Sequence, residues 1–317
     1  MKFFSLFFLL NLLGCSAIEK NISQQLTNSY AAVHLSDTRL LEEKKACVQG
    51  KCLKYLFMKA KNYQKNVEIS DEYQVSMMVK VEETEYPISY NAYHEYQSFG
   101  GHFQGAAFIF PGFGAAHSTM WLYGLWLSHS GFDVIILPSA SQMTPFSFGL
   151  DIVSYANILA EEYKPVLTIA ASLGYVAALE FTQQYRPHSI VALAPVLDTS
   201  SDKLAEYFLN TKLLPWYLNW LSHSQVKEQI NRIAQETNTV QALHHHQLNA
   251  KNSLGSTLVL SSANDTILGN IQPRSCAVVV DHGHALISSV PFESSRHAIR
   301  RHFQAKDKRD HHCYPDF

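Results

Sequence analysis

The 317-residue sequence lacks the features that mark several common protein classes. Its formal net charge is only −2 and no basic patch is present, which argues against a nucleic-acid partner. It contains no glycine-rich phosphate loop and no internal repeat, so neither a nucleotide site nor a repeat architecture is expected. Beyond the first residues, no apolar run is long enough to span a bilayer. The length of the chain suits one globular domain with insertions, and the missing phosphate loop predicts no cofactor.

Cysteine is also scarce, with five residues in the chain. Cys15 ends the first apolar segment, and the remaining four are Cys47, Cys52, Cys276 and Cys313. An even set in an exported chain predicts two disulfides, because oxidising compartments let such bonds persist. Three pairings are possible. The one that joins Cys47 to Cys52 closes a local turn and would leave Cys276 to pair with Cys313.

The N-terminal residues 1–17 have the organisation of a secretory signal, with one lysine, a short apolar stretch and then small residues. Leu-Leu-Gly-Cys at 12–15 resembles a bacterial lipobox, which would make Cys15 the lipidated first residue of the mature protein. Ordinary cleavage after Ala17 is the alternative. The lipobox predicts attachment to a membrane through a lipid anchor, and Ser16 resembles the signal for an outer-membrane lipoprotein facing the periplasm or the surface.

One serine lies where a nucleophile would be expected. Residues 166–171 are apolar and β-prone, and a helical pattern follows from Tyr175. Between them, Ser172 is flanked by the small residues Ala170 and Gly174. A sharp strand-to-helix turn exposes a serine hydroxyl and tolerates only small neighbours. The pattern therefore predicts that Ser172 is the catalytic nucleophile, whereas an ordinary serine in a core turn is the alternative.

A carboxylate candidate follows a later strand. Residues 256–262 are typical of a buried strand, and Asp265 comes where the carboxyl edge of a sheet would present it. Asp198, after the strand at 189–195, and Asp281 are the rivals. We expect Asp265 to orient the catalytic base.

The base is expected in the loop after residues 276–281, which contains two histidines. His284 is favoured because it directly precedes an apolar segment, and His282 is the alternative. Either imidazole could accept the Ser172 proton while a carboxylate holds its other ring nitrogen.

Acyl transfer also needs hydrogen-bond donors for the developing oxyanion. The strand at 105–111 ends in a glycine-rich turn, in which Gly112 and Gly114 allow the backbone to bend sharply. We expect the amide of Phe113 to point into the site beside the amide of Leu173, which follows the nucleophile.

Together these motifs resemble the α/β-hydrolase superfamily from about residue 72 to 305, near its serine aminopeptidase-like or monoacylglycerol lipase-like branch. The resemblance rests on Pro-Gly-Phe-Gly (111–114), Ala-x-Ser-x-Gly (170–174), Asn-Asp (264–265) and Gly-His-Ala (283–285), in the order Ser, Asp, His. Alanine at 170 and proline at 111 depart from the usual glycine and histidine. The resemblance implies an α/β fold with a mostly parallel sheet flanked by helices. It also implies a small acyl ester or lipid as substrate.

The expected domain organisation has four parts: the signal at 1–17, an N-terminal extension at 18–72, the hydrolase domain at 73–305 and a tail at 306–317. Two β-like runs at 74–82 and 87–94 are expected to open the sheet. Further strands are expected near 105–111, 132–138, 166–171, 189–195, 256–262 and 276–281.

A helical lid is expected at about 199–250, because this connection is longer than one crossover helix requires. Its segment 207–221 carries apolar residues that could line an acyl pocket or pack on the core. They are Phe208, Leu213, Leu214, Trp216, Tyr217, Trp220 and Leu221.

No metal site is expected. The histidines at 244–246 and 311–312 are consecutive and lack a carboxylate or cysteine pattern, so we expect them on the solvated surface.

The leading hypothesis is a serine hydrolase of the bacterial envelope that cleaves carboxylic esters or thioesters through an acyl-enzyme. An acyltransferase with the same triad and an aminopeptidase-like peptidase are alternatives. A lipid-anchored binding protein that keeps the fold without turnover is a third, and it would gain if Ser172, Asp265 and His284 lay apart.

Overall fold

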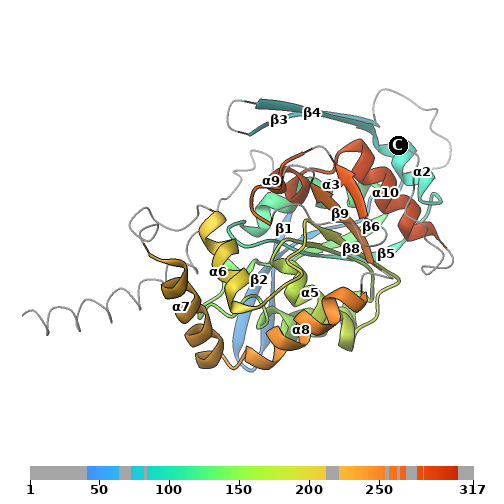
Figure 1. Ribbon diagram of the computed structural model, residues 1–317. Coiled ribbons are helices and arrows are strands. Elements are labelled where there is room, and N and C mark those ends of the chain that lie inside the picture. Colours follow the sequence, from blue (N-terminus) through green and yellow to red (C-terminus); the bar gives the residue numbers. More distant parts are fainter. Residues whose placement is uncertain are drawn as a thin grey trace, which may run out of the picture.

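An eight-stranded sheet forms the centre of the molecule (Figure 1). The computed structural model describes residues 41–63, 73–81, 84–211, 221–253, 257–262, 265–268, 277–280 and 282–305. The strand order is β1-β2-β6-β5-β7-β8-β9-β10. The strands are β1 (Glu42–Val48), β2 (Lys51–Met58), β5 (Gly105–Phe110), β6 (Phe132–Ile136), β7 (Pro165–Ala171), β8 (Ser189–Leu193), β9 (Thr257–Ser262) and β10 (Ala277–Val280).

The sheet is mostly parallel, as predicted. From β6 to β10 every neighbouring pair is parallel, whereas β1 pairs with β2 and β2 with β6 in antiparallel fashion. Parallel strands present their carboxyl ends at one edge, so the residues after β7, β9 and β10 come together although they are far apart in the sequence.

The start of the sheet differs from the prediction. We expected residues 74–82 and 87–94 to open it, but β3 (Gln74–Val81) and β4 (Thr84–Asn91) form a separate two-stranded sheet. This arm lies above the main body in Figure 1. The edge of the main sheet is instead formed by β1 and β2, from the predicted N-terminal extension. Local β-propensity identified strands here but could not specify their partners, which depend on tertiary packing.

Helices cover both faces of the sheet (Figure 1). Along β5, Ala107 and Ile109 face one core while Phe108 and Phe110 face the other, as the two-residue period of a strand requires. The first core includes residues of α3 (Trp121–His129), α9 (His284–Ser289) and α10 (Glu293–Gln304), and α2 (Ala92–Ser98) precedes β5. The second includes residues of α4 (Ile152–Tyr163), α5 (Gly174–Gln184) and α8 (Val240–Ser253). Short 3-10 helices occupy His117–Met120 and Ala140–Gln142.

The predicted lid region contains α6 (Ser201–Asn210), α7 (His223–Glu236) and α8. A third apolar cluster joins α6 and α7 to the end of the sheet, and it includes Phe208 and Ile230. In contrast, Ala250 of α8 belongs to the core beside α5. Within the predicted lid region, α6 and α7 therefore pack on the end of the sheet, whereas α8 lies beside α5 and adds Leu243 to the third cluster. Leu213, Leu214, Trp216, Tyr217 and Trp220 lie outside the described residues.

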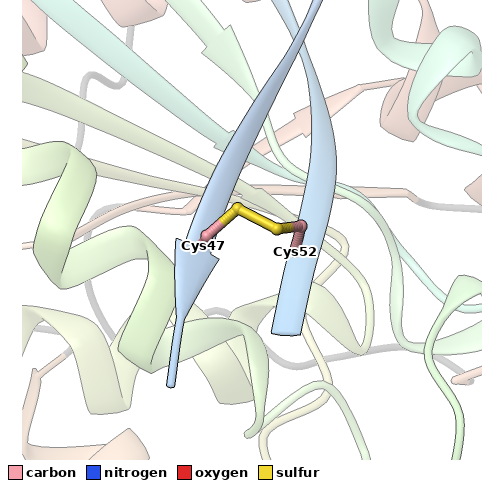
Figure 2. Close-up of a disulfide and its surroundings, with 2 residues drawn as sticks. All are labelled: Cys47 and Cys52. Atoms are coloured by element: carbon pink, nitrogen blue, oxygen red, sulfur yellow. A yellow bond between two sulfur atoms is a disulfide. The ribbon is translucent and has the colours of Figure 1, made fainter. Parts of the chain in front are cut away.

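One predicted disulfide is confirmed. Cys47 and Cys52 face each other across β1 and β2 and are joined by a bond between their sulfur atoms (Figure 2). Cys276 and Cys313 lie outside the described residues, as does the candidate lipidation site Cys15. None of the helices in the described part of the chain is both long and apolar enough to cross a membrane.

Candidate active site

Ser172 lies at a sharp turn between β7, which ends at Ala171, and α5, which begins at Gly174. Its φ angle is +48°, a left-handed conformation that non-glycine residues seldom adopt. Gly174 fits here because a Cβ atom at this position would lie 2.4 Å from the carbonyl oxygens of both Phe110 and Pro111. The small residues of the pattern therefore let the turn pack directly against the end of β5.

Ser172, His284 and Asp265 form a continuous chain of hydrogen bonds. The Oγ atom of Ser172 is 2.9 Å from Nε2 of His284, and Nδ1 of His284 is 2.7 Å from Oδ2 of Asp265. All three residues are buried. A carboxylate on Nδ1 favours the tautomer that protonates this nitrogen, which leaves Nε2 to accept the serine proton. The geometry can therefore support proton transfer from Ser172 to His284.

The backbone holds the Asp265 carboxylate from the opposite side. Its Oδ1 atom accepts hydrogen bonds from the amides of Ile267 at 2.9 Å and Leu268 at 2.8 Å. Burial by itself would raise the pKa of Asp265, but the hydrogen bond and charge of His284 and the two amides outweigh it, so the pKa is lowered. Asp265 thus remains a carboxylate at neutral pH.

The rival residues lie elsewhere. Asp198 accepts a hydrogen bond from the amide of Ser200 at 2.9 Å, just before α6. The ring of His282 stacks on Phe292, with 3.7 Å between ring centroids. Asp281 lies outside the described residues. The structure therefore brings Asp265 and His284, the favoured pair, to Ser172.

The glycine-rich turn after β5 packs against the serine. A Cβ atom on Gly112 would lie 3.0 Å from the Cβ atom of Ser172, so this glycine permits the close approach. The amide of Gly114 donates to the Oγ atom of Ser141 at 3.2 Å, which ties the turn to the segment after β6. Phe113, between the two glycines, is buried, and its ring packs against those of Tyr207 and Phe208. The donor roles of the Phe113 and Leu173 amides stay predictions.

A further residue at the site was missed by the sequence analysis. The hydroxyl oxygen of Tyr207, in α6, is 3.0 Å from Ser172 Oγ. Burial raises the pKa of Tyr207, while its contacts with Ser172 and with the backbone N–H of Leu173 work in the opposite direction. Nothing in the local sequence distinguishes this tyrosine from the phenylalanine that follows it, because its role depends on how α6 folds back over the sheet.

The prediction that residues 244–246 are all solvated is wrong for His246. His244 and His245 are exposed, but His246 is buried and its Nε2 lies 3.0 Å from the carbonyl oxygen of Val196. Burial lowers the pKa of His246 to about 4. Among the described residues, no group of three or more histidine, cysteine, aspartate or glutamate side chains could hold a metal ion. His311 and His312 lie outside them.

Comparisons with known proteins give a match at the level of structure. No family model matches the chain, and no curated protein sequence matches it significantly. The structure of the Pyrococcus furiosus esterase Pf2001 aligns with 88% of this chain and 97% of its own, with a TM-score of 0.51 and 12% identity. The chain has the α/β-hydrolase fold. A monoglyceride lipase variant from Saccharomyces cerevisiae aligns with 86% of this chain and 98% of its own, with a TM-score of 0.47 and 11% identity.

Proposed function

We propose that this α/β-hydrolase-fold protein is a serine hydrolase that cleaves carboxylic esters or thioesters. One observation carries the proposal: Ser172, His284 and Asp265 are joined by hydrogen bonds of 2.9 and 2.7 Å, with the serine in a positive-φ turn at the end of β7. A binding protein that merely kept the fold would have no need for this strained turn and aligned triad. The convergence therefore favours turnover.

In the proposed reaction, Ser172 Oγ attacks the carbonyl carbon of the substrate while its proton passes to Nε2 of His284. The carbonyl electron pair moves onto oxygen, and the resulting oxyanion is held by the amides of Phe113 and Leu173. The intermediate then collapses and breaks the bond to the alcohol or thiol, which leaves with the proton from His284. Asp265 stabilises the imidazolium during both transfers.

The acyl-enzyme is resolved by water. His284 takes a proton from the water molecule, whose oxygen attacks the acyl carbon, and returns that proton to Ser172 as the carboxylic acid leaves. No step in this sequence requires a metal or an organic cofactor.

The proposal is tested by labelling the purified mature protein with a fluorophosphonate probe and mapping the modified residue by mass spectrometry. Wild-type protein should be labelled at Ser172, and Ser172→Ala should lose both labelling and hydrolysis of p-nitrophenyl esters, by about 10⁴-fold or more in kcat. Ser130→Ala is the matched control, because Ser130 is also buried and its hydroxyl group donates to the carbonyl oxygen of Trp126, in α3. Equal ester hydrolysis by Ser172→Ala and wild type would reject the proposal.

Acyl transfer to an alcohol is a second candidate, favoured by the burial of the nucleophile. Ser172 is only 3% exposed and lies beneath α6. Limited access of water lengthens the life of an acyl-enzyme and gives an alcohol acceptor time to compete. The ratio of transfer product to free acid, measured with added glycerol or a long-chain alcohol, separates this activity from hydrolysis.

We also propose that the protein acts in the cell envelope as a lipoprotein, a hypothesis that rests on residues 1–17 of the sequence. Metabolic labelling with an alkyne fatty acid should mark the bacterially expressed chain, and Cys15→Ala should abolish the label. A labelled Cys15→Ala variant would contradict lipidation at this residue.

A further inference from the structure

The hydroxyl group of Tyr207 is directed at the reacting atom of the proposed nucleophile. The oxygen of this hydroxyl group lies 3.0 Å from Ser172 Oγ. Ser172 Oγ in turn bonds to Nε2 of His284. Because Nδ1–H of His284 donates a hydrogen bond to Asp265, Nε2 of the neutral ring can only accept, and the Ser172 hydroxyl group is its donor. The single proton of Ser172 is then already used, so in the contact between the two hydroxyl groups Tyr207 is the donor and Ser172 Oγ the acceptor. The phenol is therefore a hydrogen-bond donor in the site.

Packing alone does not explain a tyrosine at this position. The ring belongs to the apolar cluster between α6 and the sheet, where Phe113, Phe146, Phe148 and Phe208 fill similar volumes without a hydroxyl group. Its centroid lies 5.2 Å from that of Phe208 and 6.4 Å from that of Phe113. A hydroxyl group buried among such rings is costly unless it is hydrogen-bonded. Here its partner is the proposed nucleophile.

The phenol oxygen also lies near the place where negative charge would develop. Two groups contact the phenol oxygen, namely Ser172 Oγ and the backbone N–H of Leu173. This amide is one of the two expected oxyanion donors, so a substrate carbonyl oxygen would take up the position next to it. When the substrate oxygen replaces the phenol oxygen at the Leu173 amide, the Tyr207 O–H group would lie next to the oxyanion and could donate to it. Because burial raises the pKa of Tyr207, the group remains protonated and able to donate at neutral pH.

Helix α6 is held in place at both ends, which positions the phenol. The amide of Ser200 donates to Asp198 at 2.9 Å before the helix, and Thr199 Oγ1 donates to the Leu243 carbonyl at 2.6 Å. At its other end, Asn210 Nδ2 donates to the carbonyl of Ile267 at 3.2 Å. Ile267 is also one of the residues whose amide holds Asp265. The tyrosine and the triad are thus attached to the same loop.

A cavity of about 190 Å³ borders Tyr207. It lies between α6, the chain after β8 and the residues after Asp265, and Val196 and Leu268 are part of its wall. Tyr207 therefore contacts both this cavity and the proposed nucleophile.

From these observations we infer that Tyr207 is a further catalytic residue, which donates a hydrogen bond to the tetrahedral oxyanion beside the amides of Phe113 and Leu173. The inference rests on the proposed serine hydrolase function. It assigns part of the proposed catalytic machinery to α6, a helix of the predicted lid region.

The experiment compares Tyr207→Phe with Tyr90→Phe as the matched control. Tyr90 is also buried, but it belongs to β4, and its hydroxyl oxygen lies 3.2 Å from Nδ1 of His129 rather than at the triad. Tyr207→Phe should lower kcat/KM for p-nitrophenyl esters by about 10- to 100-fold, mainly through kcat, as expected for the loss of one oxyanion donor. Tyr90→Phe should retain the wild-type rate. Thermal unfolding of both variants checks that each is folded.

A second measurement uses phenylboronic acid, which forms a tetrahedral adduct with an active-site serine. Its affinity should fall in Tyr207→Phe by about the same factor as kcat/KM, because a transition-state donor is lost. Incorporation of 3-fluorotyrosine at position 207 keeps the hydroxyl group and should therefore keep most of the wild-type turnover, unlike Tyr207→Phe.

The outcomes separate the inference from the proposed function. If wild-type protein is labelled at Ser172 by the fluorophosphonate but Tyr207→Phe has unchanged or higher kcat/KM, the hydroxyl only blocks the empty site and the inference is overturned. If the folded wild-type protein neither reacts with the probe nor hydrolyses esters, the proposed function itself fails.

Discussion

The carboxyl ends of the strands and helix α6 contribute to the same candidate site by different means. At the strand ends, backbone geometry positions the groups: Ser172 sits in a positive-φ turn, and Asp265 is held by two amides. Helix α6 contributes one side chain, Tyr207, from an apolar cluster. The strand ends thus supply the three residues of the proposed triad, whereas α6 supplies one proposed hydrogen-bond donor. Changes at the strand ends should therefore cost far more activity than changes in the lid.

The largest effect beyond Ser172 is expected for Asp265→Asn. The amide would present the wrong partner to His284 Nδ1 and favour the tautomer that cannot accept the serine proton, so kcat should fall by about 10⁴-fold. Asp198→Asn is the matched control, because Asp198 accepts a hydrogen bond from the amide of Ser200 before α6, so this variant should retain most of the activity. Steady-state kinetics on the two variants measures the difference, and similar losses in both would contradict the assignment of Asp265.

A smaller but clear effect is expected for Gly174→Ala, which tests the backbone of the sheet edge. The new Cβ atom would collide with the carbonyl oxygens of Phe110 and Pro111 at 2.4 Å, so the turn must shift. Overpacking of this kind costs about 1–3 kcal/mol of unfolding free energy, and a shift of the serine by about 1 Å costs about 10²-fold in activity.

Gly283→Ala provides the control for this substitution, because a Cβ atom there would meet nothing within 4 Å. Urea denaturation should show an unchanged unfolding free energy for Gly283→Ala. A Gly174→Ala variant that is as stable and active as wild type would show that the close packing of the turn is dispensable.

The third prediction concerns His246 of α8, which bonds to the chain just after β8. Its pKa is about 4 in the folded protein because of burial, against an ordinary value of 6.5. Between these values the unfolded chain binds a proton that the folded chain does not, so acidification destabilises the fold. From pH 7 to 5, His246 should account for a loss of about 2 kcal/mol of unfolding free energy.

Urea denaturation at the two pH values measures this loss. His246→Gln should remove most of the His246 contribution, and the exposed neighbour serves as the control in His244→Gln, which should leave the pH dependence unchanged. Equal pH dependence in His246→Gln and wild type would contradict a neutral, buried His246.

The smallest effect on activity is expected at the sheet edge formed by β1 and β2. The Cys47–Cys52 disulfide closes a short loop between two strands that already pair at these residues. Loop-closure entropy for so few residues limits its contribution to about 2 kcal/mol, and the double variant C47S/C52S should keep full esterase activity. Thermal unfolding and steady-state kinetics check both values. A large loss of activity would show that the geometry of the candidate active site depends on this disulfide.

The strands and the sharp turn at Ser172 were predicted from the sequence because near neighbours in the chain dictate them. Alternation of apolar residues identified the strands, and small residues around Ser172 identified the sharp turn. The sequence did not predict which strands form the edge of the main sheet. The β-propensity of a segment such as β3 does not specify the strand with which it pairs. His246 was misplaced for a similar reason: its neighbours His244 and His245 are exposed, and helix periodicity alone did not show which of the three faces inward.

By itself, the sequence determined a mostly parallel α/β fold and a short list of residues able to carry acyl chemistry, because strand patterns and turn composition depend on near neighbours. The tertiary structure placed His284 rather than His282, and Asp265 rather than Asp198, in the hydrogen-bonded chain with Ser172, because such contacts join strand ends that are distant in sequence. It also brought Tyr207 to Ser172. That contact arises from the packing of α6 over the sheet edge, which no local pattern encodes.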